Sequence, residues 1–215
     1  MDKKSIVVIG AGPGLGNAIG KRFGKGGYNV ALVARSEDKL AGYQEELADL
    51  GIEASVYAAD ASDFDAFAKT IEDIRSEKGD PDVVVYNVGI TTPDEDPLTP
   101  EDLMRHFAAD VAGAYAAIEG FSTKGFAEKK GAIILTGGGF ADYPFPGYVA
   151  LSLDKAALRN LAQEKNQELA DSGIFVGTVT VCDTIGGSEH FSPDNIADCF
   201  WELNQTRDSF EVKYQ

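Results

Sequence analysis

The sequence predicts an α/β protein with one doubly wound parallel sheet and helices on both faces, and residues 1–215 are expected to form a single domain. Short apolar segments alternate with longer amphipathic segments along the whole chain. The apolar segments IVVI, VVVY and AIIL lack alternating polar residues, which is typical of strands covered on both faces. Right-handed crossovers between such strands produce a doubly wound sheet.

The predicted strands are short and rich in β-branched and aromatic residues. In chain order they cover residues 5–10, 28–34, 52–58, 82–87, 131–137, 173–181 and the terminal segment SFEVKY.

The predicted helices have apolar residues spaced three and four apart. They cover residues 14–24, a segment capped by Ser36, a segment capped by Ser62, residues 99–128, 148–171 and 192–206.

Three of these helices carry more detailed predictions. The helix after Ser36 should bury one face that ends at Leu50, and the helix after Ser62 should turn Phe64 inward. Thr99 is expected to cap a helix with proline in its first position, and that helix should break near Gly113.

The charge balance limits the partners that this chain could bind. It has 19 Lys and Arg against 35 Asp and Glu, giving a formal net charge of −16. This argues against nucleic acid and anionic membranes as partners, because phosphate binding needs a basic surface. Two cysteines without metal-ligand spacing predict reduced thiols and no metal site. A first apolar segment that leads into glycines predicts a strand rather than a signal peptide, and hence a cytoplasmic protein.

A glycine-rich turn follows the first predicted strand and opens the first helix. Glycines are needed where the backbone turns tightly and approaches a pyrophosphate, and the helix N-terminus offers free N–H groups. The strand–glycines–helix order predicts a dinucleotide site rather than a turn that binds nothing. The residues expected to contact the cofactor here are Gly10, Gly12, Gly14, Leu15 and Gly16.

The end of the second strand predicts NADP as the cofactor in preference to NAD. NAD sites usually place an acid at this position to bind the ribose 2′-hydroxyl, whereas here Ala34 precedes Arg35. Arg35 can pair with a 2′-phosphate, although a solvated arginine at a helix start is the alternative. Asp60 and Ala61 follow the third strand, where an acid can accept from the adenine amino group.

These features resemble the short-chain dehydrogenase/reductase family over nearly the whole chain. The glycine motif, Asp60, the segment containing Asn87 and Gly89, and the segment starting at Lys155 match family motifs in the expected order. The resemblance implies a Rossmann-type domain and an oxidoreductase that acts on a carbonyl or alcohol. It also implies that Asn87, Gly89 and Lys155 contact the cofactor, and that the chain forms a homo-oligomer, either a dimer or a tetramer.

The catalytic pattern departs from the family. Its members use a Tyr as acid/base, a Lys that lowers the pKa of that Tyr, a Ser that polarises the carbonyl and an Asn in a proton relay. Leu151 stands four residues before Lys155, where the Tyr is expected. Gly138 occupies the Ser position and Asp110 the Asn position. Of the four catalytic positions, only the lysine remains.

Two residues could substitute for the missing groups. Tyr148 lies seven residues before Lys155, close to two helical turns, although a packing role for it is the stronger interpretation. Thr136 could replace the serine but lies two positions away on a strand. His106 and His190 are interpreted as surface or helix residues rather than catalytic ones.

Three functions remain open at this point. The intact cofactor motifs and Lys155 favour an NADP-dependent oxidoreductase with a non-standard active site and an unknown small-molecule substrate. The loss of the other catalytic groups favours a catalytically inactive NADP-binding sensor or scaffold. A vestigial nucleotide site is the third possibility. The substrate is not readable from loops without recognised motifs.

Overall fold

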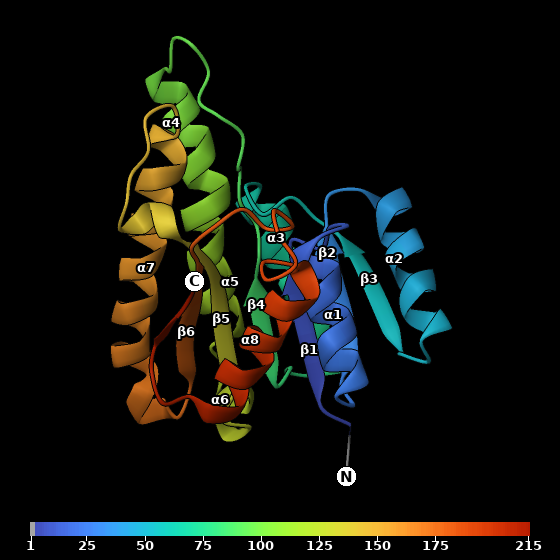
Figure 1. The fold of residues 1–215 in the computed structure, drawn as a ribbon. Coiled ribbons are helices and arrows are strands. Elements are labelled where there is room, and N and C mark those ends of the chain that lie inside the picture. Colours follow the sequence, from blue (N-terminus) through green and yellow to red (C-terminus); the bar gives the residue numbers. More distant parts are fainter. Residues whose placement is uncertain (1–2) are drawn as a thin grey trace.

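Seven parallel strands form one sheet in the order β3-β2-β1-β4-β5-β6-β7 (Figure 1). The structure is a computed structural model that describes residues 3–215. The strands are β1 (Ser5–Ile9), β2 (Asn29–Ala34), β3 (Ala54–Ala58), β4 (Val83–Tyr86), β5 (Ala132–Gly138), β6 (Phe175–Val181) and β7 (Glu211–Tyr214). Each lies within a segment predicted as a strand or extends one residue beyond it, and the predicted fold class is confirmed.

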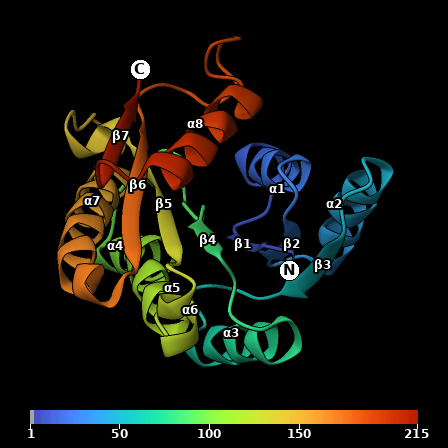
Figure 2. The same cartoon turned by 90° about the horizontal axis from the view of Figure 1, so that it is seen from below.

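Eight α-helices connect the strands within the described residues. They are α1 (Leu15–Lys25), α2 (Glu37–Asp49), α3 (Phe64–Lys78), α4 (Pro100–Phe107), α5 (Gly113–Phe121), α6 (Lys124–Glu128), α7 (Val149–Leu169) and α8 (Pro193–Thr206). Figure 2 shows α1, α2 and α8 on one face of the sheet, and α3, α5 and α7 on the other. Within residues 3–215, every helix is too short or too polar to span a lipid bilayer.

The sheet separates two hydrophobic cores. On β1, Ile6 and Val8 pack into the core beneath α1, α2 and α8, whereas Val7 and Ile9 pack into the core beneath α3, α5 and α7. Because successive side chains of a strand point to opposite faces, two covered faces require an uninterrupted apolar strand. Fully burying each such side chain contributes about 1.5–3 kcal/mol.

Of the three residues expected to cap a helix, two are confirmed and one is wrong. Ser36 accepts from the backbone N–H of Lys39 at the start of α2, and Thr99 forms a reciprocal capping box with Asp102 at the start of α4. Ser62 does not cap α3. Its hydroxyl donates to Asp60 Oδ1 at 2.6 Å, and the cap is Asp63 instead.

Two residues expected on buried faces are exposed. Leu50 is 49% exposed because α2 ends at Asp49, so Leu50 lies beyond its last turn. Phe64 is 45% exposed at the first position of α3. The apolar spacing therefore predicts the buried positions inside α2 and α3 but fails at the C-terminal end of α2 and at the first residue of α3.

The predicted break near Gly113 is a π-helical turn, Ala108–Ala112, that joins α4 to α5. A Cβ on Gly113 would lie 2.8 Å from the carbonyl oxygen of Ala61, so this glycine lets the helix approach the loop after β3 closely. The helical region also ends at Phe121 before α6 begins, which the sequence did not indicate.

Candidate functional site

The loop between β1 and α1 is shaped by two close backbone approaches. Gly10 has φ +90°, in the region that favours glycine, and a Cβ there would lie 2.6 Å from the carbonyl carbon of Asn87. A Cβ on Gly16 would lie 2.5 Å from the carbonyl oxygen of Gly10. The fold itself therefore requires these two glycines, whatever the loop binds.

Gly12 and Gly14 are open on the side where a Cβ would stand, because it would meet no atom within 4 Å. Gly14 is the N-cap of α1 and offers no side chain to the first N–H groups of the helix, at Leu15 and Gly16. A cavity of about 190 Å³ adjoins this end of α1 and is lined in part by Pro13 and Gly14. Open glycines at an uncapped helix N-terminus fit a pyrophosphate.

Arg35 and Asp60 stand at the carboxyl ends of β2 and β3. Arg35 is exposed, and among residues 3–215 it forms no ion pair. The hydroxyl and backbone N–H of Ser62 donate to Asp60 Oδ1, and together with the charge of Arg35 they lower the pKa of Asp60. Ala61 is buried beside them. This corner holds an ionised acid next to an unpaired guanidinium.

A chain of hydrogen bonds links the glycine loop to α7. Asn87, just after β4, donates through Nδ2 to the carbonyl oxygen of Gly10 at 3.1 Å. Its Oδ1 accepts from Thr136 Oγ1 at 2.9 Å. The carbonyl oxygen of Thr136 accepts from Lys155 Nζ at 3.0 Å. Gly10, Asn87 and Lys155, predicted separately from distant segments, are therefore brought together at one end of the sheet.

Lys155 shares this end of the sheet with a buried carboxyl group. A Cβ on Gly89 would lie 3.4 Å from both Lys155 Nζ and Asp110 Oδ2, so these atoms flank one point beside an exposed backbone. Burial lowers the pKa of Lys155, and the carboxyls of Asp110 and Asp154 oppose this shift. Burial raises the pKa of Asp110, which the charge of Lys155 and a hydrogen bond from the Ile90 N–H oppose. The lowered pKa of Lys155 and the raised pKa of Asp110 both move toward neutral pH, which makes it easier for these groups to exchange protons.

Leu151 and Gly138 border the lysine. Leu151 is buried on α7, one turn before Lys155. A Cβ on Gly138 would lie 3.3 Å from Lys155 Cγ, so the lysine stem packs against the bare backbone of that residue. A side chain at position 138 would require the stem to shift. Thr136 cannot readily take a carbonyl-polarising role, because its hydroxyl already donates to Asn87.

Tyr148 lies in an aromatic cluster just before α7. It stacks on Phe140 with ring centroids 5.4 Å apart and also contacts Phe145, at 6.2 Å between centroids. The helix begins at Val149, and Tyr148 has non-helical dihedral angles. The two-turn spacing to Lys155, which assumed a helix starting by residue 148, therefore does not hold.

Four further residues are new to the site or differ from their expected placement. Asp94, in the loop after β4, accepts from the N–H groups of Val149 at 2.6 Å and Ala150 at 3.2 Å, and so caps α7. Asp154 is buried on the same face of α7 as Leu151, an acid within an apolar stripe that could have been noticed. His106 lies on a helix as expected but is buried, whereas His190 is exposed and stacks on Tyr214.

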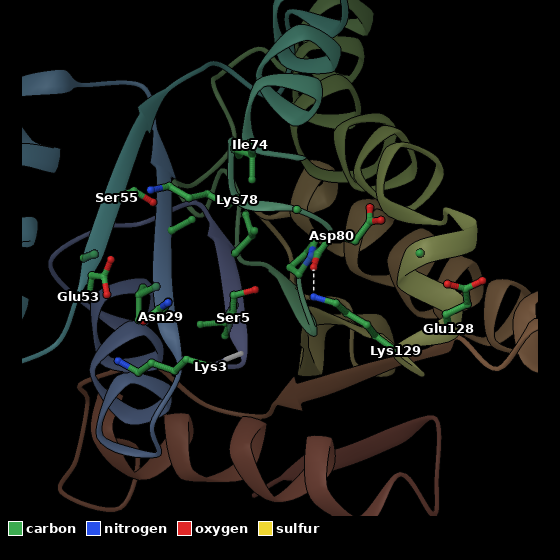
Figure 3. Close-up of a pocket in the computed structure, with 18 residues that line it drawn as sticks. Lys3, Ser5, Asn29, Glu53, Ser55, Ile74, Lys78, Asp80, Glu128 and Lys129 are labelled. Atoms are coloured by element: carbon green, nitrogen blue, oxygen red, sulfur yellow. Dashed lines mark hydrogen bonds between the residues drawn. The ribbon is translucent and has the colours of Figure 1, made fainter. Parts of the chain in front are cut away.

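A larger cavity, of about 690 Å³, lies at the opposite end of the sheet (Figure 3). Residues at the starts of the first three strands line it, among them Ser5, Asn29 and Glu53, together with Lys78 and Asp80. Ligands of open parallel sheets bind at the carboxyl ends of the strands. None of the predicted cofactor or catalytic residues lines this cavity, so it is not the candidate site.

Comparisons with known proteins point to one family. The family model described as short chain dehydrogenase matches residues 4–186. A glucose 1-dehydrogenase from Gluconobacter oxydans is 32% identical over 183 residues, which cover 82% of this chain and 67% of that protein. A 3-oxoacyl-[acyl-carrier-protein] reductase from Staphylococcus epidermidis is 30% identical over 185 residues, covering 82% of this chain and 73% of that protein.

Solved structures agree with the observed fold. A metagenomic short-chain oxidoreductase in complex with NADP superimposes with a TM-score of 0.87 at 28% identity, covering 99% of this chain and 97% of that one. An actinorhodin polyketide ketoreductase with NADPH has a TM-score of 0.90 at 20% identity, covering 99% of this chain and 95% of that one. At that lower identity the likeness concerns the fold alone.

Proposed function

The chain belongs to the short-chain dehydrogenase family, and we propose that it is an NADP(H)-dependent oxidoreductase acting on a carbonyl or alcohol through a non-standard active site. The observation that carries the proposal is the position of Lys155. Its buried ammonium is linked through Thr136 and Asn87 to the glycine loop and flanks the open backbone of Gly89. A proton-exchanging group thus stands beside the expected dinucleotide site.

The residues at the carboxyl ends of the strands fit a nicotinamide dinucleotide. The backbone from Gly10 to Gly16 would hold the pyrophosphate, and Arg35 would pair with a 2′-phosphate. Asp60 and Ala61 would border the adenine, while Asn87, Gly89 and Lys155 would border the nicotinamide half. When bound, the cofactor supplies or accepts the hydride.

The active site is non-standard because the family's spacing assigns Leu151, Gly138 and Asp110 to the tyrosine, serine and asparagine positions. Leucine exchanges no proton and glycine donates no side-chain hydrogen bond. Lys155 is left as the group that can give a proton to a carbonyl oxygen, or take one from an alcohol. Burial favours this role, since a lowered pKa brings the ammonium closer to giving up its proton near neutral pH.

Replacing the lysine tests this role. In a screen of aldehydes, ketones and quinones with NADPH, we expect turnover by the wild type and a loss of about 10²–10⁴-fold in kcat for Lys155→Met. Methionine keeps most of the length of the lysine side chain without its charge. Lys165→Met is the matched control, because Lys165 is equally buried at 6% exposed on the same helix but pairs with Glu119 and Glu168.

The control should keep its turnover. Equal activity of Lys155→Met and wild type would contradict the role of the lysine. No turnover by the wild type with any carbonyl, while NADPH binds, would contradict the enzymatic proposal itself.

A catalytically inactive NADP-binding sensor is the second candidate. Leu151, buried where the family places its acid/base, favours it. In this case NADPH would change the binding of a partner protein or the assembly state. Identical sedimentation and partner capture with and without NADPH would contradict this candidate.

A further inference from the structure

Four titratable side chains are buried together behind Gly89. His106 lies on α4, Asp110 on the π-helical turn, and Asp154 and Lys155 are neighbours on α7. Their exposed fractions are 4%, 0%, 2% and 6%. Figure 1 shows α4 running alongside α7. We refer to His106, Asp110 and Asp154 as the buried triad.

Each member of the buried triad has a polar atom without a hydrogen-bond partner among the described residues. These atoms are His106 Nδ1, Asp110 Oδ2 and Asp154 Oδ2. His106 Nδ1 and Asp154 Oδ2 lie 4.0 Å apart, too far for a direct hydrogen bond. Burying an ionised carboxylate with an oxygen that lacks a donor costs several kcal/mol. Protonation of Asp110 and Asp154 removes this cost, so the two carboxyl groups favour holding protons.

The protonation states of these groups depend on one another. Burial and the nearby Asp110 raise the pKa of Asp154 to about 7, against the opposing charge of Lys155. Burial raises the pKa of Asp110, while Lys155 and His106 act in the opposite direction. Groups coupled in this way gain and lose protons as a unit. Near neutral pH the two coupled carboxyl groups can therefore supply or accept a proton.

Among the described residues around the triad, Lys155 carries the positive charge and the other groups are neutral or acidic. From β4, Tyr86 donates its hydroxyl to the carbonyl oxygen of Ala109, and burial raises its pKa so that it stays neutral. Asp60 approaches Tyr86 from the loop after β3. From the loop after β4, the N–H of Ile90 donates to Asp110 Oδ1. From α7, Lys155 is the charge that faces both carboxyl groups.

We propose that His106, Asp110 and Asp154 form a buried proton store that supplies Lys155 with the proton it exchanges with a ligand oxygen beside Gly89. The inference rests on the proposed function, because it assumes that Lys155 faces the reacting oxygen. The contact point is the space over Gly89, where one atom would touch both Lys155 Nζ and Asp110 Oδ2. His106 and Asp154 act through Lys155 and are positioning residues, whereas Asp110 also borders the contact point itself.

The proton balance of a carbonyl reduction follows from this arrangement. The bound cofactor would supply the hydride to the carbonyl carbon, and the Lys155 ammonium would give its proton to the oxygen as the carbonyl π bond breaks. The neutral amine of Lys155 then takes a proton from a carboxyl of the triad. Solvent protonates the triad again, so that one hydride and one proton convert the carbonyl to an alcohol. Alcohol oxidation runs through the same steps in reverse.

The first measurement uses the protein without nucleotide. Urea unfolding at pH 5 to 8 compares the wild type with Asp154→Asn and Asp110→Asn. Because the folded pKa of Asp154 exceeds its unfolded value, the folded protein binds more protons between about pH 4 and 7, and this contribution to stability declines as pH rises. We therefore expect both variants to gain stability relative to the wild type as pH rises from 5 to 8. A difference that stays constant over this range in both variants would overturn the proton store.

The second measurement detects coupling to a ligand. Calorimetric titration with NADPH in two buffers of different ionisation heat gives the number of protons exchanged on binding. The nucleotide phosphate titrates as well, so the difference between wild type and variant is the relevant quantity. We expect Asp110→Asn and Asp154→Asn to change the exchanged protons by about half or more of the wild-type value near pH 7. Glu164→Gln, an exposed carboxyl on α7, should leave it unchanged.

The outcomes separate this inference from the proposed function. Altered proton exchange in both Asp variants supports the store, whereas exchange equal to the wild type in both overturns its coupling to the site. If one of the Asp variants does not fold, His106→Gln takes its place in the comparison. We expect His106→Gln to alter the number of exchanged protons as well. Absence of carbonyl turnover would contradict the proposed function, but the stability and proton measurements would still decide the store.

Discussion

At the scale of single residues, the glycines of the loop between β1 and α1 fall into two kinds: those that the fold requires and those that face the expected ligand. A Cβ would strike backbone at Gly10 and Gly16 but meet open space at Gly12 and Gly14. The sequence pattern treats all four as one motif, because spacing alone does not reveal which glycine faces the protein. The structure assigns two of them to the fold and leaves two facing the expected ligand.

This difference predicts opposite consequences for two alanine substitutions. Gly16→Ala should lower the free energy of unfolding, by about 1–3 kcal/mol, because its methyl group would overlap the backbone of Gly10. Gly12→Ala should unfold like the wild type but bind NADPH more weakly, since the methyl group would stand where the pyrophosphate approaches. Thermal unfolding and nucleotide titration of both variants check this, and normal NADPH binding by Gly12→Ala would contradict the placement.

The catalytic residues show where residue-level prediction stops. Lys155 was found because it sits in a recognisable segment, and the structure links it to Asn87 through Thr136. The environment of the lysine could not be read in the same way. Asp154 approaches His106 only because α7 packs against α4, a tertiary contact without a local sequence signal.

At the scale of elements, helix starts were predictable to within one residue wherever the cap lies next to its helix, with Asp63 capping α3 where Ser62 was expected. Thr99 and Ser36 are local caps and were found, whereas α7 is capped by Asp94 from a loop more than fifty residues earlier. The side chain of Tyr148, the N-cap residue of α7, makes no hydrogen bond to the first backbone N–H groups of the helix. A cap supplied by a distant loop leaves no pattern in the sequence beside the helix.

Removing this distant cap should weaken the junction between the loop and α7. Asp94→Ala is expected to cost about 0.5–2 kcal/mol in the free energy of unfolding, the usual cost of losing a helix cap. Glu95→Ala, at an exposed neighbouring position, is the control and should stay within about 0.5 kcal/mol of the wild type. Urea denaturation compares them, and equal stability of the two variants would argue against the cap.

At the scale of the whole molecule, the doubly wound parallel sheet was predictable because parallel strands follow strong connection rules, whereas the order of the strands comes from the structure. The net charge of −16 is consistent with a solvated outer surface, and the apolar strands lie inside, with both faces of the sheet covered by helices. The outer sides of α4 and α7 are an exception. They expose Met104 at 73%, Phe107 at 48% and Leu153 at 55%.

We expect these apolar side chains to be covered by a second copy of the chain, in keeping with the homo-oligomer that the family resemblance implies. Static light scattering should give a mass of at least about twice the 22.9 kDa of one chain. Leu153→Glu should shift the protein toward the single-chain mass, because it would bury a charge in the contact. A wild-type mass equal to one chain would contradict this expectation.

The central claim is that this protein binds NADP(H) at the glycine loop and selects it through Arg35. Fluorescence titration with NADPH and NADH tests it most directly, on the wild type, Arg35→Ala and the control Arg105→Ala. We predict tighter binding of NADPH than NADH by the wild type. Arg35→Ala should lose about 10- to 100-fold in NADPH affinity, the value of charge-assisted hydrogen bonds, with little change for NADH. Equal losses for both nucleotides, or no saturable binding by the wild type, would contradict the account.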